Sequence, residues 1–144
     1  MIRKLDYDQT RQIIRDLVPP VVGQYRVPEQ MTWPAVEMSS MNVMKSGCGL
    51  AYGNFAGESP VGVLVGMVIP EPKTGVQVGI EHLWWSAPGH NGLPLLRAFE
   101  ADCRAAGCKR VIFGYYETVN PDRMRKIYSG LGYAPYNTSV SKEL

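Results

Sequence analysis

Apolar residues recur at helical spacing near the start of the chain. After a short predicted strand, Ile2–Leu5, either Asp8 or Thr10 is placed to cap a helix. Pro19-Pro20 should end this helix, because proline has no N–H to donate to a continuing one. The apolar positions that would share one helix face are Ile13, Ile14 and Leu17.

A second helix is predicted from Thr32, because Pro34 fits a first helical turn. The preceding stretch, Val21–Gln30, favours no single element. The apolar residues expected roughly on one side of the helix are Trp33, Val36, Met41 and Met44. The methionines of this region could line a substrate mouth, but ordinary core packing is the favoured interpretation: Met31, Met38, Met41 and Met44.

Three strands joined by short turns follow. The segments Leu50–Phe55, Val61–Ile69 and Val76–Trp85 are rich in apolar residues, and the turns between them contain Gly, Pro and Ser. The middle segment is almost continuously apolar, so it should be buried on both faces. The pattern predicts an antiparallel meander.

The pattern then changes to helix, strand and helix. Asn91 is expected to cap a helix that ends at Gly107, and Arg110–Gly114 reads as a buried strand parallel to the one before the helix. Asn120-Pro121 is expected to begin the last helix, and Tyr133–Leu144 to supply one or two closing strands. The whole predicts one α/β domain, residues 1–144, with a mixed sheet.

Composition narrows the class of protein. The chain has 144 residues, of which 45% are hydrophobic, and a formal net charge of +2. Such a length supports one core, and so small and scattered a charge argues against nucleic acid as a partner. No apolar run is long enough to cross a membrane, and the first residues lack the apolar core of a signal peptide. The three cysteines have no metal-binding spacing. We expect a soluble, cytoplasmic protein without a metal.

The stretch Leu83–Gly107 is the candidate for chemistry. Its sequence, LWWSAPGHNGLPLLRAFEADCRAAG, reads as a strand end, a loop with Pro and Gly, and an amphipathic helix. A helix that begins directly after such a loop points its free N–H groups into the loop, where they favour an anion such as phosphate.

A family resemblance becomes visible in the last helix. The segment from Asn120 to Tyr133, NPDRMRKIYSGLGY, is similar to the signature of the GNAT (GCN5-related N-acetyltransferase) superfamily. The signature has an Asn after the fifth strand, a helix that ends in Tyr, two or three residues, and Gly-Phe or Gly-Tyr. The strand end Ile80–Trp85 resembles the family's fourth strand, and the helix from Leu95 lies where its coenzyme A helix begins. The N-terminal half agrees only in the order of elements.

The resemblance implies a mixed sheet of about six to seven strands with about four helices, in which the parallel fourth and fifth strands splay apart around acetyl-CoA. It implies that backbone N–H groups of the loop hold the pyrophosphate, and that Asn120 contacts the coenzyme. The loop residues concerned are Gly89, His90, Asn91, Gly92 and Leu93. The strand residues implied to hold the pantetheine arm are Leu83, Trp84 and Trp85.

The resemblance further implies acetyl transfer to a primary amine by direct attack. Tyr128 would protonate the leaving thiolate as general acid. Glu81, or its neighbour His82 on the opposite strand face, would take the proton of the amine. Each has a plainer interpretation. Tyr128 has the helical spacing of a core aromatic residue. Glu81 could be a solvated or paired carboxylate on a strand, and Asn120 could be an ordinary helix cap. A lone histidine, such as His82 or His90, is usually structural or exposed.

The loop departs from the family pattern. Gly92 matches the second glycine, but His90 occupies the position of the first and Ala87 that of an Arg or Gln. This departure keeps open an alternative, a catalytically degenerate protein of the same fold that serves as a binding or structural subunit. The acceptor amine is not encoded in any motif, and Trp33, Tyr136 and the methionines could supply a homodimer interface.

Overall fold

The computed structural model describes residues 1–22, 32–116 and 120–142. Their contacts divide the chain into two compact units. The N-terminal unit is Met1–Gly114, and the C-terminal unit is Tyr115–Leu144. The prediction for Val21–Gln30 lies mostly outside the described residues, as does Met31.

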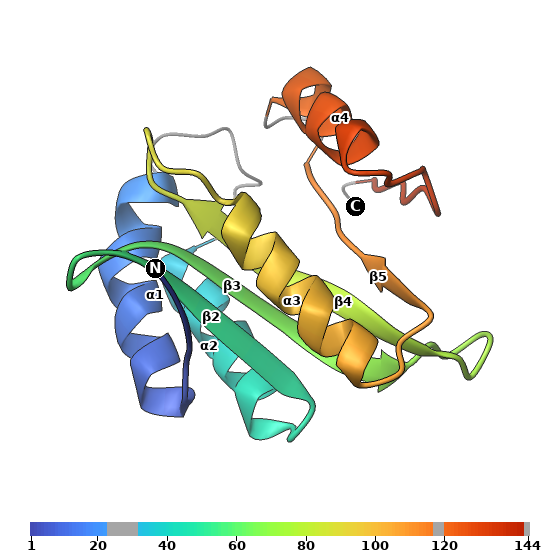
Figure 1. Cartoon of the computed structure of the whole chain (residues 1–144), viewed down its shortest axis with the longest axis horizontal. Coiled ribbons are helices and arrows are strands. Elements are labelled where there is room, and N and C mark those ends of the chain that lie inside the picture. Colours follow the sequence, from blue (N-terminus) through green and yellow to red (C-terminus); the bar gives the residue numbers. More distant parts are fainter. Residues whose placement is uncertain (23–31, 117–119, 143–144) are drawn as a thin grey trace. The chain divides into compact units, whose positions relative to one another are not determined.

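The N-terminal unit is built on a sheet whose strands follow one another in chain order (Figure 1). Neighbouring strands from β1 to β4 are antiparallel, which confirms the predicted meander, and β4 and β5 are parallel, as predicted. The described residues contain five strands, fewer than the six or seven expected. Their bounds are β1 Ile2–Lys4, β2 Gly49–Ala56, β3 Ser59–Pro70, β4 Gln77–Ser86 and β5 Arg110–Ile112.

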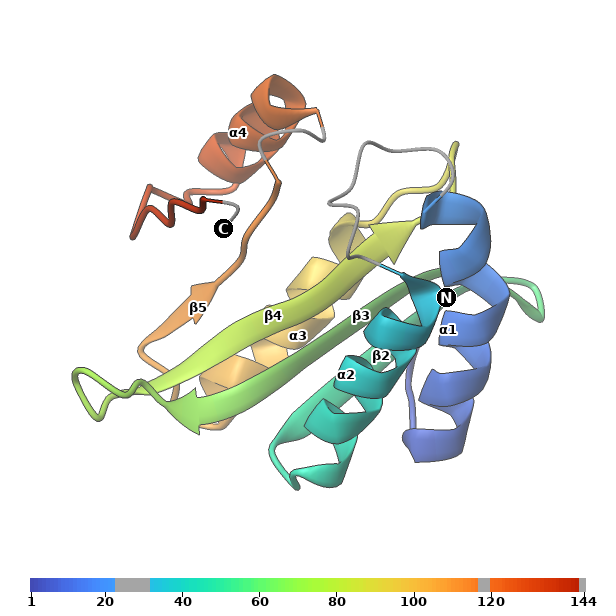
Figure 2. The ribbon, with the colours of Figure 1, turned by 180° about the vertical axis from the view of Figure 1, so that it is seen from behind.

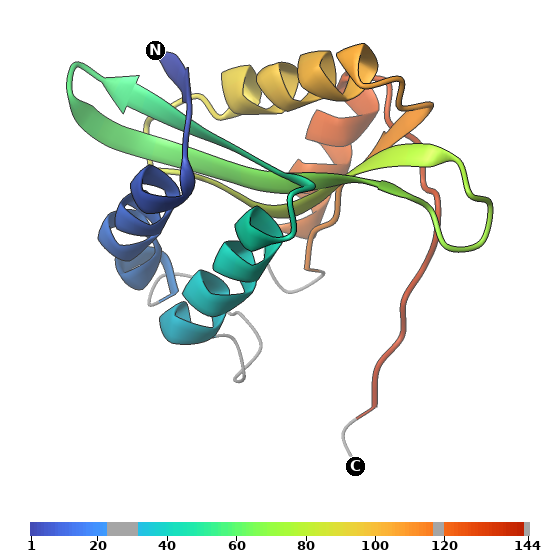
Figure 3. The same cartoon turned by 90° about the horizontal axis from the view of Figure 1, so that it is seen from below.

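Helices cover both faces of this sheet. Helices α1 (Tyr7–Val22) and α2 (Trp33–Lys45) pack on one face, and α3 (Leu93–Ala105) on the other (Figure 3). The strand β3 serves both layers, because Val63 and Val65 belong to the cluster under α1 and α2 while Leu64 belongs to the cluster under α3. The prediction that this strand is buried on both faces is confirmed.

Helix α1 differs from its prediction at both ends. It begins at Tyr7, one residue after Asp6, so neither Asp8 nor Thr10 is its cap. Asp6 and Gln9 exchange hydrogen bonds between backbone N–H and side-chain oxygen, 2.8 and 3.0 Å long, in the manner of a capping box. Pro19-Pro20 lie within the last turn rather than beyond it, because the φ angle of proline suits a helix and only two hydrogen bonds are lost there.

Helix α2 follows its prediction closely. Thr32 is the N-cap, its hydroxyl accepts from the Ala35 N–H at 3.4 Å, and Pro34 lies in the first turn. Met41 is buried, and Met38 is exposed. The buried face also contains Glu37 and Ser40, two polar residues that the hydrophobic pattern did not predict.

Helix α3 begins one residue later than Asn91 implied. Its N-cap is Gly92, and Asn91 instead accepts from the Leu93 N–H through its side chain at 3.0 Å. At the other end, Gly107 has φ of 79°, and the Cys108 N–H donates to the Cys103 carbonyl at 2.9 Å. This is the left-handed ending that the glycine predicted.

The C-terminal unit contains α4, Pro121–Gly130. Gly132, with φ of 85°, turns the chain so that the Tyr133 N–H donates to the Tyr128 carbonyl at 2.9 Å, as expected of a glycine after a helix. Residues 131–142 form no strand, so the expectation of closing strands from Tyr133 is wrong for the part of this segment that is described.

Candidate functional site

The parallel pairing of β4 and β5 is short. In the ribbon, β5 is much shorter than β4 (Figure 2). Three residue pairs connect the strands, the last being Ile80 with Ile112. Beyond it, Glu81–Ser86 continue β4 and pair with β3 on the other side. The Gly114 N–H donates to the Glu81 carboxylate at 3.4 Å. The ladder between β4 and β5 therefore gives way at Glu81, which leaves one edge of β4 without a partner strand among the described residues.

Glu81 lies at this point of separation. Burial raises the pKa of its carboxyl to about 7, and the hydrogen bond from the Gly114 N–H only partly offsets that effect. A carboxyl with such a pKa exists in both protonation states near neutral pH, which suits a group that accepts a proton in a reaction.

His82 occupies a β-bulge. Glu81 pairs with Gly66 and Leu83 with Val65, so His82 has no opposite residue on β3. Its ring reaches α2, where Nε2 lies 3.0 Å from the Ser39 hydroxyl. Leu83 also packs into the cluster under α1 and α2. The bulge therefore places two consecutive side chains on this face of the sheet.

The loop between β4 and α3 satisfies some of its backbone N–H groups by hydrogen bonds within the loop. Pro88 and Gly89 form the centre of a turn, with φ of 80° at Gly89, and the His90 N–H donates to the Ala87 carbonyl at 3.0 Å. The Leu93 N–H is held by Asn91. Within the described residues, the amides of Asn91 and Gly92 make no hydrogen bond. Of the predicted phosphate donors, these two and Gly89 have an amide without a hydrogen bond in the described residues, and Asn91 and Gly92 lie next to the N-terminus of α3.

Gly92 has a packing role of its own. A Cβ atom there would lie 2.6 Å from the Ser86 hydroxyl oxygen and 3.1 Å from the Trp84 indole nitrogen. Glycine thus lets the start of α3 rest on the end of β4. The Ser86 hydroxyl is buried and has no hydrogen-bond partner in the described part of the chain.

The two tryptophans lie on opposite faces of β4. Trp84 packs in the cluster under α3, edge to face with Phe113 at a ring distance of 5.7 Å. Trp85 lies opposite Val63, and its buried indole N–H has no partner among the described residues. Core packing accounts for Trp84.

Asn120 and Tyr128 belong to the C-terminal unit. Asn120 precedes α4 in a left-handed conformation, with φ of 46° and ψ of 51°, and its side chain makes no capping bond. Asn120 is the N-cap, as its plainer interpretation predicted, and it serves through its backbone, whose carbonyl accepts from the Met124 N–H at 3.1 Å. Asparagine tolerates the left-handed conformation. Tyr128 is buried, stacked on Tyr115 at 5.9 Å and tilted against Tyr133 at 5.5 Å.

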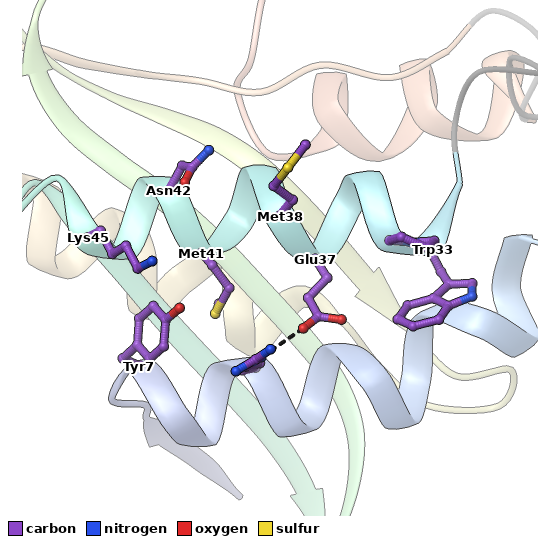
Figure 4. A pocket seen from close by; sticks show the side chains of 9 residues that line it. Tyr7, Trp33, Glu37, Met38, Met41, Asn42 and Lys45 are labelled. Carbon is purple, nitrogen blue, oxygen red and sulfur yellow. Dashed lines mark hydrogen bonds and ion pairs between the residues drawn. The ribbon is translucent and has the colours of Figure 1, made fainter.

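Sequence reasoning missed a polar groove on the outer side of α1 and α2 (Figure 4). The buried Glu37 carboxylate accepts from Arg11 at 2.8 Å and from Arg15 at 2.9 Å. The i, i+4 spacing of the two arginines was the available signal. The cavity measures about 420 Å³ and is lined by Tyr7, Arg11, Trp33, Pro34, Glu37, Met38, Met41, Asn42 and Lys45.

Comparison with known proteins gives matches to solved structures only; no family model and no curated protein sequence matches. A GCN5-related N-acetyltransferase from Ralstonia eutropha JMP134 superposes with a TM-score of 0.72 over 100% of this chain and 97% of its own, at 18% identity. A ribosomal-protein-alanine N-acetyltransferase from Brucella melitensis biovar Abortus 2308 gives 0.71, with 100% and 99% covered, at 16% identity.

A predicted acetyltransferase from Clostridium acetobutylicum, solved with acetyl-CoA, gives 0.73 at 11% identity, with 99% of this chain and 95% of that one covered. The chain has the GNAT fold. At these identities the likeness concerns the fold, and the GNAT elements found here are the meander, the crossover through α3 and the separating parallel pair β4 and β5.

The described residues of this GNAT fold have two further features. They contain no cluster of His, Cys, Asp and Glu suited to a metal ion. None of their helices is both long and apolar enough to pass through a bilayer.

Proposed function

We propose that this protein is an N-acyltransferase that moves an acetyl group from acetyl-CoA to a primary amine. The observation that carries the proposal is the end of β4–β5 pairing at Ile80 and Ile112 within a GNAT fold. The open edge of β4 then offers backbone groups to the amide-rich pantetheine arm. The free amides of Asn91 and Gly92, beside the N-terminus of α3, suit the pyrophosphate.

The transfer is direct. The amine nitrogen attacks the thioester carbon, a C–N bond forms, and the C–S bond breaks. Glu81 and His82 are the candidates for accepting the amine proton, and Tyr128 is the candidate for protonating the thiolate. A cysteine intermediate is not part of the proposal, because Cys103 is buried and burial raises the pKa of its thiol to about 12.

The first test is calorimetric titration with acetyl-CoA on wild type and on Asn91→Asp. Aspartate keeps the oxygen that accepts from the Leu93 N–H and adds a negative charge at a helix N-terminus, where it stabilises the fold by about 0.3–1 kcal/mol. The same charge repels a pyrophosphate. We expect acetyl-CoA affinity to fall at least about tenfold, or 1.4 kcal/mol, while the melting temperature holds or rises.

Asn42→Asp is the matched control, since it makes the same chemical change at an exposed position on α2. It should leave acetyl-CoA affinity unchanged. Absence of acetyl-CoA binding to the wild type at millimolar concentration would refute the proposal, and equal affinity of wild type and Asn91→Asp would remove the phosphate role of this loop.

Tyr128→Phe tests the general acid. Phenylalanine keeps the ring that packs against Tyr115 and Tyr133 and removes only the hydroxyl. Because a positioned acid contributes roughly 10²–10⁴ to a rate, we expect kcat to fall at least about a hundredfold. Unchanged transfer by a folded variant would show that another group, or water, protonates the thiolate.

The loop also favours a second candidate, a binding or structural subunit of the same fold. The His90 amide is consumed by the turn, and packing on Ser86 explains Gly92 without a ligand. A protein of this kind would retain its stability and bind no acetyl-CoA, so the same titration separates the two candidates.

A further inference from the structure

Ser39 makes two close contacts at once. Its hydroxyl oxygen lies 3.2 Å from the Val36 carbonyl, one turn back in α2, and 3.0 Å from Nε2 of His82 on β4. Ser39 is half-buried, whereas His82 is exposed in part. The contact depends on the bulge at His82, which places this ring and Leu83 on the same face of the sheet.

Counting protons decides the direction of the two bonds. A serine hydroxyl has one proton to donate. If that proton went to Nε2, the contact with the Val36 carbonyl would join two acceptors. Both contacts are hydrogen bonds only if the hydroxyl donates to Val36 and accepts from an Nε2–H of His82. Nδ1 of the neutral ring then carries the lone pair.

We propose that Ser39 is a positioning residue that holds His82 as its Nε2–H tautomer, so that Nδ1 is the base for the acceptor amine. This inference rests on the proposed function. In the step, the proton of the attacking amine moves to Nδ1 as the C–N bond forms, and the coenzyme A thiolate that leaves takes a proton from Tyr128 or from water. The imidazolium afterwards returns its proton to solvent.

The surroundings suit a neutral ring. Burial of part of the ring lowers the pKa of His82 below its ordinary value. Its chain neighbour Glu81 is directed to the Gly114 N–H, and Glu37 of α2 is held by Arg11 and Arg15. The part of β3 opposite the bulge, Val65 and Gly66, contributes no titratable side chain. The serine is thus the polar contact that sets the tautomer.

The test is ¹⁵N NMR of the histidine rings, which needs no substrate. The chain has two histidines, so the signals lost in His82→Asn identify His82. In the wild type above the pKa, we expect the proton on Nε2 and a lone pair on Nδ1. Ser39→Ala, which favours the helix and should fold, is expected to move both nitrogen shifts toward a mixture of tautomers. Ser39→Thr, which keeps a hydroxyl, should restore them.

A wild-type ring protonated on Nδ1, or nitrogen shifts that are equal in wild type and Ser39→Ala, would overturn the assignment. The second measurement is steady-state kinetics with an amine found by screening. Ser39→Ala should lower kcat about ten- to a hundredfold with the KM for acetyl-CoA unchanged, and Ser39→Thr should recover it. An unchanged kcat in Ser39→Ala refutes the positioning role of Ser39.

The two failures are distinguishable. If the wild type binds no acetyl-CoA, the proposed function and the base role both fail, whatever the tautomer. If it binds acetyl-CoA and transfers acetyl groups, and Ser39→Ala changes neither the tautomer nor kcat, only the role of Ser39 fails, and Glu81 and His82 both remain candidate bases.

Discussion

The two halves of β4 belong to one strand but differ in their pairing and in the side chains they carry. From Val78 to Ile80 the strand has β3 on one side and β5 on the other. Val78 is fully buried, and Gly79 is where Cys103 of α3 touches the strand. Sheet pairing on both edges and the packing of α3 on one face leave this half little to offer a ligand.

From Glu81 to Ser86 the same strand has one open edge and carries a titratable carboxyl, a bulged histidine and a buried hydroxyl without a partner in the described residues. These features cost stability in the free protein. Polar groups of this kind gather where chemistry or binding occurs, so the contrast locates the candidate site more firmly than any single residue does.

The largest expected effect is the pH dependence caused by Glu81. Its pKa is about 7 in the folded protein and near the ordinary 4.5 when unfolded, so the unfolded chain loses its proton first. The contribution of Glu81 to stability should therefore fall as pH rises from 4.5 to 7 and stay level above that, by roughly 3 kcal/mol in total. Glu81→Gln, which is always neutral, should lack this fall. Urea unfolding at pH 5 and pH 8 measures the difference.

Glu58→Gln is the control for this prediction. Glu58 is exposed, and its bond with Arg3 lowers the pKa of its carboxyl, so it stays ionised across the window. The variant should keep the slope of the wild type. Parallel curves for wild type and Glu81→Gln would mean that Glu81 is solvated and that burial does not distinguish the second half of β4 from the first.

The next effect concerns the paired half. A Cβ atom at Gly79 would lie too close to the Cys103 sulfur and 3.1 Å from a Val111 methyl carbon. Gly79→Ala should cost about 1–3 kcal/mol of unfolding free energy, because overpacking forces neighbours to shift. Acetyl-CoA affinity of the folded variant should stay unchanged.

A double-mutant cycle with Cys103→Ala sharpens this prediction. Removing the sulfur makes room for the added methyl group, so the double variant should lose less stability than the sum of the two single variants. Strict additivity would show that Cys103 is not what requires glycine at position 79.

Much of the N-terminal unit was predictable because its signals are local. The Thr32 cap with Pro34, the turns between apolar strands, and the helix ending at Gly107 each depend on a few neighbouring residues. Glu37 was missed because its burial depends on Arg11 and Arg15 of another helix. The start of α1 was misassigned because Asp6 and Gln9 form a capping box that lacks the usual Ser or Thr.

The candidate site was predictable in its location and less so in its details. The change from apolar strand to Pro-Gly loop to helix marked Leu83–Gly107, and the family resemblance supplied the roles. The contact of Ser39 with His82 could not be read from the chain, since it spans 43 positions and requires a bulge. Which loop amides remain free depends on the turn at Pro88 and Gly89.

The smallest effect on stability is expected from Ser86, in the open half of β4. Its buried hydroxyl has no hydrogen-bond partner within the described chain, so Ser86→Ala should raise the free energy of unfolding by up to about 1 kcal/mol. If the hydroxyl awaits a group of the coenzyme, the same variant should bind acetyl-CoA several-fold more weakly. A gain in stability with a loss in affinity is the mark of a binding group.

Ser40→Ala supplies the comparison, because Ser40 carries the other buried serine hydroxyl without a hydrogen-bond partner in the described residues. Ser40 lies on α2, which packs on one face of the sheet. It should stabilise the fold to a similar degree and leave acetyl-CoA affinity unchanged. If Ser86→Ala behaves like Ser40→Ala in both measurements, the hydroxyl of Ser86 is a packing imperfection, and the binding groups of the open half are its backbone and the loop amides.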